Sequence, residues 1–198
     1  MVVSIEEIKR LRELTGVGMT DAKKALEESN GNFDKALTEM RKKGLTKAEK
    51  RSERETRAGV IGTYNHDSRI GVIVEVNCET DFVARNEMFI NLVKDITLHV
   101  AASNPEYISI KDVKNDVKNI VREEYKEKAK AEGKPANMIE KIVDGQLNKY
   151  FSEKCLLEQA FVKNLDQTVG DYIKEHSARF GENIVVRRFK RMALGEIV

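Results

Sequence analysis

The residue types best suited to chemistry gather in the segment Glu75–Ala84, which contains a thiol, carboxylates and an aromatic ring. Cys78 would be the nucleophile of a thiol enzyme and His66 its base. Asp67 or Asp81 would orient that base. Nothing in the spacing holds these groups together, and a single cysteine after an apolar strand is usually a small buried hydrophobe. We therefore expect Cys78 to be structural.

The same segment offers a second chemistry, the recognition of another protein. Asp81 and Phe82 follow an apolar strand at a strand-to-helix corner, where an acidic and a large apolar side chain would project toward a partner. In the alternative, Thr80 is merely the N-cap of a helix and Asp81 complements its dipole. Phe82 would then pack into the core. The residues alone leave both interpretations open.

No established catalytic signature occurs elsewhere in the chain. The phosphate-binding GxxxxGK[ST], the dinucleotide-binding GxGxxG, the zinc-binding HExxH and the hydrolase GxSxG motifs are all missing from the sequence. Cys78 and Cys155 lie far apart, with no cysteine or histidine at ligand spacing, which argues against a disulfide framework and a zinc site. We expect a protein that is not an enzyme and that holds no metal or cofactor.

Composition narrows the class of protein further. The 198 residues are 40% hydrophobic and 34% charged, and 35 basic against 33 acidic residues leave a net charge of +2. Such a balance argues against a protein that coats nucleic acid. No stretch approaches the length of a membrane span, and the polar N-terminus does not resemble a secretory signal. We expect a cytoplasmic protein without membrane contact.

Two basic segments leave one alternative function open. Residues 41–57 contain many lysines and arginines and few apolar residues, which is typical of an exposed linker. Residues 187–191 form a cationic strand with one aromatic ring, which could neutralise and stack on RNA, although alternating cations more often form the wet face of a sheet. An RNA- or ribosome-binding accessory protein is therefore the alternative.

The first residues have the pattern of a small helical unit. Ser4 and Glu7 form a capping box that predicts a helix start. Gly16 and Gly18 permit a tight reversal, after which Thr20 is expected to cap a second helix.

A third helix completes this unit. Asn32 is its expected cap and Gly44 its expected end. Three short helices must pack on one another to be stable. We predict a helical domain over residues 1–44, followed by a charged linker over residues 45–57.

Residues 58–198 are expected to form an α+β core with a small antiparallel sheet packed against helices. β-branched runs at 59–64 and 69–77 predict a hairpin whose second strand is covered on both faces. A helix is expected to begin at Thr80 and to carry the buried stripe that ends at Val100. More helices follow, and residues 183–194 predict a closing strand.

Two long segments, Leu11–Leu26 and Glu75–Ala84, resemble the signatures of the bacterial translation elongation factor Ts family. Further stretches that are similar to this family are Glu132–Pro135, Gly145–Lys149, Cys155–Gln159 and Val186–Phe189.

The resemblance implies a guanine nucleotide exchange factor that binds GDP-bound and nucleotide-free elongation factor Tu. It also implies a ubiquitin-associated-type bundle at the N-terminus, whose corner docks on the G domain of that partner. The residues that match the docking segment are Leu11, Arg12, Thr15, Gly16, Val17, Gly18 and Met19. Those that match the segment displacing the partner's Mg²⁺ are Thr80, Asp81, Phe82 and Val83. GDP release would follow from a shift of the phosphate-binding loop.

The length resembles the short members of the family, which lack a helical coiled-coil insertion. Such members form homodimers that present surfaces to two partner molecules, and some are linked by a cysteine near the C-terminus. Residues 183–198 contain no cysteine. A covalent dimer is therefore not expected, and a noncovalent dimer giving a two-to-two complex stays open.

Overall fold

The computed structural model describes residues 3–15 and 17–196 of the chain. Two compact units are distinguished, one formed by Met1–Thr97 with Asp171–Val198 and the other by Leu98–Gly170. The domain boundaries expected after residues 44 and 57 stay a prediction.

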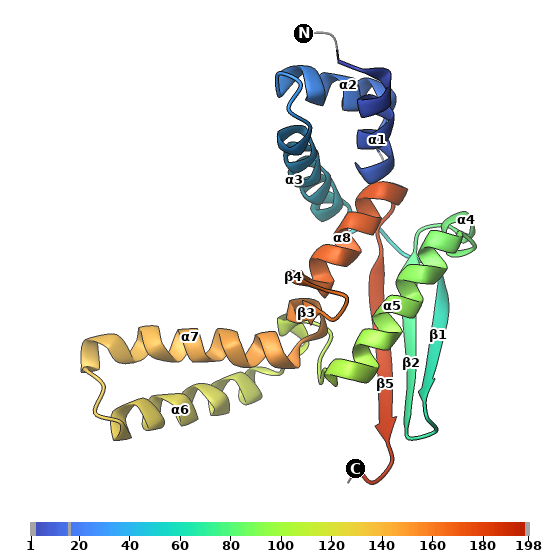
Figure 1. The fold of residues 1–198 in the computed structure, drawn as a ribbon. Helices are drawn as coiled ribbons and strands as arrows, with labels where there is room; N and C mark the ends of the chain where they lie inside the picture. Colours follow the sequence, from blue (N-terminus) through green and yellow to red (C-terminus); the bar gives the residue numbers. More distant parts are fainter. Residues whose placement is uncertain (1–2, 16, 197–198) are drawn as a thin grey trace. The chain divides into compact units, whose positions relative to one another are not determined.

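Helices and a small antiparallel sheet together confirm the predicted α+β class. The helices are α1 (Ile5–Thr15), α2 (Met19–Glu28), α3 (Phe33–Arg51), α4 (Asp81–Ala84), α5 (Glu87–Ser103), α6 (Asn115–Ala131), α7 (Ala136–Lys154) and α8 (Val169–Phe180), as labelled in Figure 1. The strands are β1 (Ala58–His66), β2 (Ile70–Cys78), β3 (Ala160–Phe161), β4 (Asn164–Thr168) and β5 (Val185–Ala193).

The predicted helix starts at Ser4 and Asn32 are confirmed. The N–H of Glu7 donates to Ser4 Oγ at 3.1 Å, and the N–H of Lys35 donates to Asn32 Oδ1 at 2.9 Å. The three N-terminal helices pack through a buried core that includes Leu11 and Leu26. This shared core supplies the stability that a single short helix lacks.

Two predicted boundaries in this region are wrong. The second helix is capped by Gly18 and begins at Met19, so Thr20 is not its cap. The third helix continues through Gly44 to Arg51, although a glycine costs about 1 kcal/mol relative to alanine within a helix. A Cβ at position 44 would lie 3.2 Å from the side chain of Ala178, so the missing side chain permits a close approach there.

The main sheet has the order β1, β2, β5, with all neighbours antiparallel. β1 and β2 form the predicted hairpin. Its turn places Asp67 and Ser68 at φ 49° and 57°, and the N–H of Arg69 donates to the carbonyl of His66 at 2.9 Å. Two successive positive φ angles are those of a type I′ turn, whose twist matches the twist of the flanking strands. β5 is the predicted closing strand.

Helix α5 packs closely on one face of this sheet. The face contains Val72, Val74 and Val76, which are all buried. Gly62 pairs with Val74, and a Cβ at Gly62 would lie 2.6 Å from both Val93 Cγ1 and Thr97 Oγ1 of α5. A glycine is therefore required where the helix crosses the strand.

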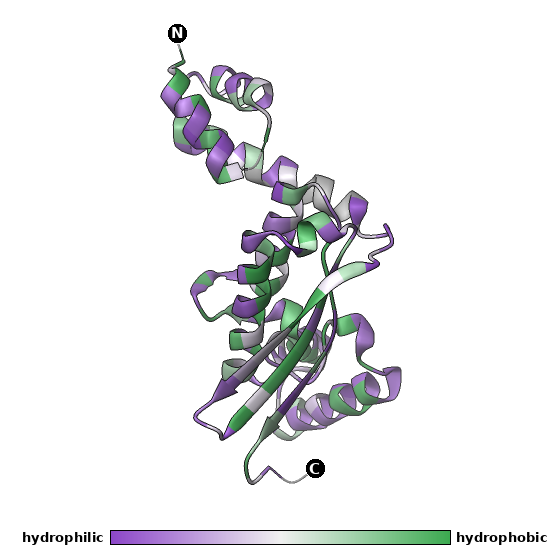
Figure 2. Cartoon of the chain, turned by 90° about the vertical axis from the view of Figure 1, so that its right-hand side faces the viewer, coloured by the Kyte–Doolittle hydropathy of each residue, from purple (hydrophilic) through white to green (hydrophobic). Residues whose placement is uncertain are grey.

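The other face of the sheet is open, so the prediction that both faces of the second strand are covered is wrong. Ile61 is 59% exposed and Ile73 is 46% exposed. Figure 2, in which hydrophobic residues are green, shows apolar residues along these strands. Glu75, Arg188 and Lys190 lie on the same face by strand register, so the apolar residues there are flanked by charges.

The helix expected to begin at Thr80 is divided into α4 and α5. Thr80 does cap α4, as predicted, because its Oγ1 accepts from the N–H of Val83 at 3.4 Å. Asn86 then starts α5, since its Oδ1 accepts from the N–H of Met88 at 2.9 Å. The interruption between Ala84 and Glu87 separates the short α4 from the long α5.

The compact unit Leu98–Gly170 contains α6, α7 and the small β3–β4 hairpin. Its core includes Val121, Val143 and Phe151, at the spacing that predicted these helices. The β3–β4 hairpin was not predicted, because strands this short produce no alternation in sequence. Within the described part of the chain, no helix is long and apolar enough to cross a membrane.

Candidate functional site: the Phe82 turn and the first helical corner

The strand-to-helix corner after β2 presents an aromatic side chain to solvent. We call Thr80 and α4 together the Phe82 turn. Phe82 is 84% exposed, which rules out the alternative that it packs into the core. Val83 is half-buried and Ala84 is buried, so the turn is anchored on one side only.

Asp81 lies beside Phe82 and is also exposed. Its Oδ2 forms an ion pair with Arg85 Nη2 at 3.2 Å, and both side chains are mostly exposed. An exposed pair of this kind contributes little to stability, because water and salt screen it. Asp81 therefore remains available to a cation or a donor on a partner.

A carboxylate far away in sequence holds the base of the Phe82 turn. The N–H groups of Glu79 and Thr80 donate to Glu182 Oε2 at 3.0 and 3.1 Å. The hydroxyl of Thr80 donates to Glu182 Oε1 at 2.6 Å. Hydrogen bonds to an ionised acceptor are stronger than neutral ones, so this base is firmly fixed.

Asn183, the residue after Glu182, binds back to Glu79. The N–H of Asn183 donates to Glu79 Oε1 at 2.6 Å. The side-chain amide of Asn183 donates to the carbonyls of Ser52 and Arg54 at 3.2 and 2.8 Å. Arg54 also pairs with Glu79 at 3.5 Å. The end of β2, the chain before β1 and the chain before β5 therefore meet at one point.

The thiol site is contradicted by the structure. Cys78 is fully buried, and its Sγ lies 3.2 Å from the carbonyl oxygen of Thr80. Burial, followed by the negative charge of Glu182, raises the pKa of Cys78 to about 11, which leaves almost no thiolate at neutral pH. Cys78 pairs with Ala58 and His66 pairs with Ile70, at opposite ends of the hairpin. His66 therefore cannot serve as a base for the thiol.

We call residues 11–19, which join the end of α1 to the start of α2, the first helical corner; the predicted docking residues belong to this segment. Leu11 and Thr15 are buried, and the hydroxyl of Thr15 donates to the carbonyl of Leu11 at 2.6 Å. These two residues shape the corner from inside. Gly16, which was also predicted, lies outside the described residues.

The accessible docking candidates are Arg12, Val17, Gly18 and Met19. Arg12 and Gly18 are exposed, Val17 is half-buried and Met19 is 39% exposed. They belong to the end of α1 and the start of α2. The Phe82 turn belongs to a different element, α4 (Figure 1).

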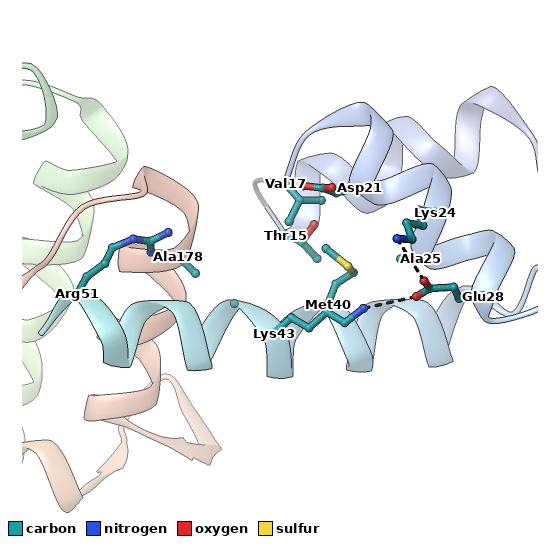
Figure 3. A pocket seen from close by; sticks show the side chains of 11 residues that line it. Thr15, Val17, Asp21, Lys24, Ala25, Glu28, Met40, Lys43, Arg51 and Ala178 are labelled. Atoms are coloured by element: carbon teal, nitrogen blue, oxygen red, sulfur yellow. Dashed lines mark hydrogen bonds and ion pairs between the residues drawn. The ribbon is translucent and has the colours of Figure 1, made fainter.

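A cavity of about 310 Å³ lies beside this corner, lined in part by Thr15 and Val17 (Figure 3). Glu28 on its rim pairs with Lys24 at 3.9 Å and with Lys43 at 3.4 Å. The rim thus carries charges of both signs. It favours no single class of small ligand.

The cationic strand β5 is partly neutralised by acidic neighbours. Arg188 Nε pairs with Glu75 Oε2 at 2.6 Å, and Arg191 Nη1 pairs with Glu196 Oε1 at 2.5 Å. These pairs reduce the positive potential that an RNA backbone would meet. Among the described residues, no group of three or more histidine, cysteine or acidic side chains is arranged to hold a metal ion.

Comparison with known proteins supplies the remaining information. The model of the family described as "Elongation factor TS" matches residues 5–196. The chain is 51% identical to elongation factor Ts of Syntrophomonas wolfei, over 98% of this chain and 92% of that protein. It is 50% identical to elongation factor Ts of Thermodesulfovibrio yellowstonii, over 99% of this chain and 98% of that protein.

Elongation factor Ts of Geobacter metallireducens is 49% identical over 99% of this chain and 91% of its own length. Relatives of nearly the same length agree with the expected short form. A family model that spans almost the whole chain, and identities near one half over the same span, lead to one conclusion. The chain belongs to the elongation factor Ts family.

Proposed function

We propose that this protein is a guanine nucleotide exchange factor for elongation factor Tu and acts by binding alone. The observation that carries the proposal is the 84% exposure of Phe82, at the tip of a turn whose base is fixed by hydrogen bonds. A large apolar side chain held in water gains free energy when a partner covers it. Thr80, Asp81, Phe82 and Val83 would approach the Mg²⁺ site of the partner.

The physical logic follows from the charge of the nucleotide. Phosphates beside Mg²⁺ depend on that cation for neutralisation, so disturbing its coordination weakens the binding of both. Insertion of Phe82 would displace the phosphate-binding loop, while Asp81 adds a negative charge near the ion. No covalent bond changes in this scheme, so the exchanger needs no catalytic group.

One side chain cannot supply the whole effect. Burial of a phenylalanine contributes about 1.5 to 3 kcal/mol. Weakening GDP about 10⁴-fold requires about 5.5 kcal/mol of differential interaction. The first helical corner, with Arg12, Gly18 and Met19 accessible and Leu11 and Thr15 shaping it from within, would add docking energy on the G domain. Because coupling is reciprocal, nucleotide that rebinds to elongation factor Tu must release the exchanger.

A noncovalent homodimer would use the open face of the main sheet. Ile61 and Ile73 are exposed there, and the aliphatic parts of Arg188 and Lys190 extend the apolar surface. Two copies packed through this face would present two Phe82 turns, one to each of two partner molecules. Translation elongation takes place in the cytoplasm, which is where we place the protein.

The deciding experiment is stopped-flow release of fluorescent GDP from elongation factor Tu, with and without this protein. The proposal requires a large acceleration that saturates with exchanger concentration. An unchanged release rate would show that the proposal is wrong. Binding to RNA, the alternative function, should weaken steeply with salt through counterion release, whereas docking through Phe82 should depend on salt much less.

A further inference from the structure

We infer that Glu182 is a positioning residue for exchange, because its carboxylate fixes the base from which Phe82 projects. The inference rests on the proposed function and adds a residue that lies outside both the Phe82 turn and the first helical corner. The contact joins positions that are 102 residues apart.

The geometry of Glu182 matches the donors it faces. Oε2 accepts from two successive N–H groups, those of Glu79 and Thr80, and Oε1 accepts from the Thr80 hydroxyl. An ionised carboxylate offers acceptors on both oxygens and no donor, so it suits three converging donors. Neither glutamine nor alanine can satisfy all three in the same way.

The contact also acts on the cap of α4. Thr80 Oγ1 donates to Glu182 and accepts from the N–H of Val83, so its orientation is set from both sides. The Val83 bond is long, at 3.4 Å. The four-residue helix has only a few backbone hydrogen bonds: the N–H of Ala84 donates to the carbonyl of Thr80 at 3.2 Å, and the N–H of Arg85 donates to the carbonyl of Asp81 at 3.1 Å. A helix this short depends on contacts outside itself for its shape. The Thr80 orientation therefore governs the direction in which the next two residues point.

Glu182 is itself held in place by the chain around it. α8 ends at Phe180, and Gly181 takes a φ of 72°, a left-handed conformation that turns the chain sharply. The hydroxyl of Ser177 donates to the carbonyl of Glu182, and the N–H of Asn183 donates to Glu79. The backbone is thus held by hydrogen bonds at Glu182 itself and at the next residue. This fixes the position from which the Glu182 carboxylate reaches the Phe82 turn.

The test compares Glu182→Ala and Glu182→Gln with Glu153→Gln, a matched loss of charge on the exposed side of α7. Full-length variants are titrated against GDP-bound elongation factor Tu, and fluorescent GDP release is recorded. The plateau rate measures release within the complex, and the half-saturating concentration measures complex formation. A partly unfolded variant lowers only the active concentration, so it moves the half-saturating concentration and leaves the plateau unchanged.

We expect Glu182→Ala to lower the plateau rate about tenfold, because the loss of a single hydrogen bond to a charged group can already change a rate by about that factor. Glu182→Gln should give a smaller loss and Glu153→Gln none. Added to Phe82→Ala, the Glu182→Ala change should lower the plateau by much less than the tenfold loss that it causes alone, because most of its effect acts through the same ring. An unchanged plateau, or losses that multiply in the double variant, overturns the inference. If Glu182→Ala fails to fold, Glu182→Gln decides on the same criteria.

A second readout needs no partner. Amide hydrogen exchange of a peptide spanning residues 78–84 should become faster in Glu182→Ala and remain unchanged in Glu153→Gln. If the wild-type protein does not accelerate GDP release, the proposed function fails, and this measurement alone decides the positioning. Faster exchange then supports it, and protection equal to that of the wild type overturns it.

Discussion

Phe82 and Ala84 lie two residues apart in the single turn of α4 and face opposite environments. Phe82 is 84% exposed, whereas Ala84 is 8% exposed. α4 packs on β1 and β2 with its inner side. The ring is therefore free to change without altering what anchors the turn.

Phe82→Ala should slow catalysed GDP release by about tenfold or more, since the lost burial is worth about 1.5 to 3 kcal/mol. Thermal stability should remain within about 0.5 kcal/mol of the wild type, as expected for an exposed position. Stopped-flow release and a thermal melt check the two halves of this prediction. Leu165→Ala, at a residue of β4 that is 74% exposed, is the matched control and should change neither. A wild-type release rate in Phe82→Ala would refute the insertion of the ring.

Asp81→Ala should lower the exchange rate less than Phe82→Ala does, provided that apolar insertion is the larger contribution. The Arg85 pair that Asp81 loses is exposed, so the fold should not be affected. Measuring both variants at low and high salt separates the two effects. The opposite order, with the larger loss in Asp81→Ala at low salt, would show that the charge of Asp81 contributes more to exchange than the ring of Phe82.

Met19→Ser should weaken the complex with nucleotide-free elongation factor Tu about three- to tenfold, because apolar area at the first helical corner would no longer be buried. Calorimetric titration measures this directly. Met138→Ser removes a methionine that is 48% exposed in α7, against 39% for Met19, and should bind like the wild type. Equal affinity of the two variants would contradict the docking role of the corner.

The helices and strands that position this site could be predicted from the sequence, because the signals that mark them are interactions between residues close together in the chain. Ser4, Glu7 and Asn32 make caps with their own neighbours, so their roles depend on little else. The β-branched run along β2 likewise predicts a strand. Thr80 was correctly expected to cap a helix.

What the sequence could not predict depends on contacts between distant segments. Whether Phe82 enters the core or the solvent is decided by how α4 packs on β1 and β2, and no local pattern contains that information. The anchor at Glu182 is hidden for the same reason. The uncovered face around Ile61 and Ile73 was missed because an apolar strand has the same composition whether one or two layers cover it.

Gly62→Ala should destabilise the protein by about 1 to 3 kcal/mol, the usual cost of overpacking a tight contact. The added methyl group would meet Val93 and Thr97 at 2.6 Å. Gly71→Ala is the natural comparison, since it lies in the neighbouring strand and its Cβ would have no neighbour within 4 Å. Urea unfolding of the two variants should separate them clearly, and similar midpoints would show that α5 moves away without cost.

Stability should fall as the pH is lowered from about 7 to about 5.5. Burial lowers the pKa of His99 and His176 below their ordinary 6.5, so the folded state keeps both neutral. His99 Nε2 donates to Gln159 Oε1 at 2.8 Å, and Nδ1 accepts from the N–H of Val162 at 3.3 Å. His176 lies near the end of α8, where a cation is ordinarily favoured, but its burial disfavours the charged form instead.

The sign follows from proton binding. Above an unfolded-state pKa of about 6.5 the contribution is fully present, and it is lost as the pH falls toward the lowered folded-state pKa, because the unfolded chain then binds more protons. Each histidine adds at most about 1.4 kcal/mol per pH unit. Urea unfolding at several pH values measures the slope. His99→Gln and His176→Gln should each reduce the slope, and slopes equal to that of the wild type in both variants would contradict the assignment.

The hydrogen bond between Thr80 and Glu182 can form only late in the synthesis of the chain. A nascent chain that has left the ribosome as far as α7 already contains the Phe82 sequence, but it lacks the carboxylate that fixes it and the strand β5 that completes the main sheet. Contacts with such a large separation along the chain form late. Under the proposed function, a product that stops before Glu182 would keep the first helical corner for docking but would exchange GDP poorly, because its Phe82 turn lacks the anchor.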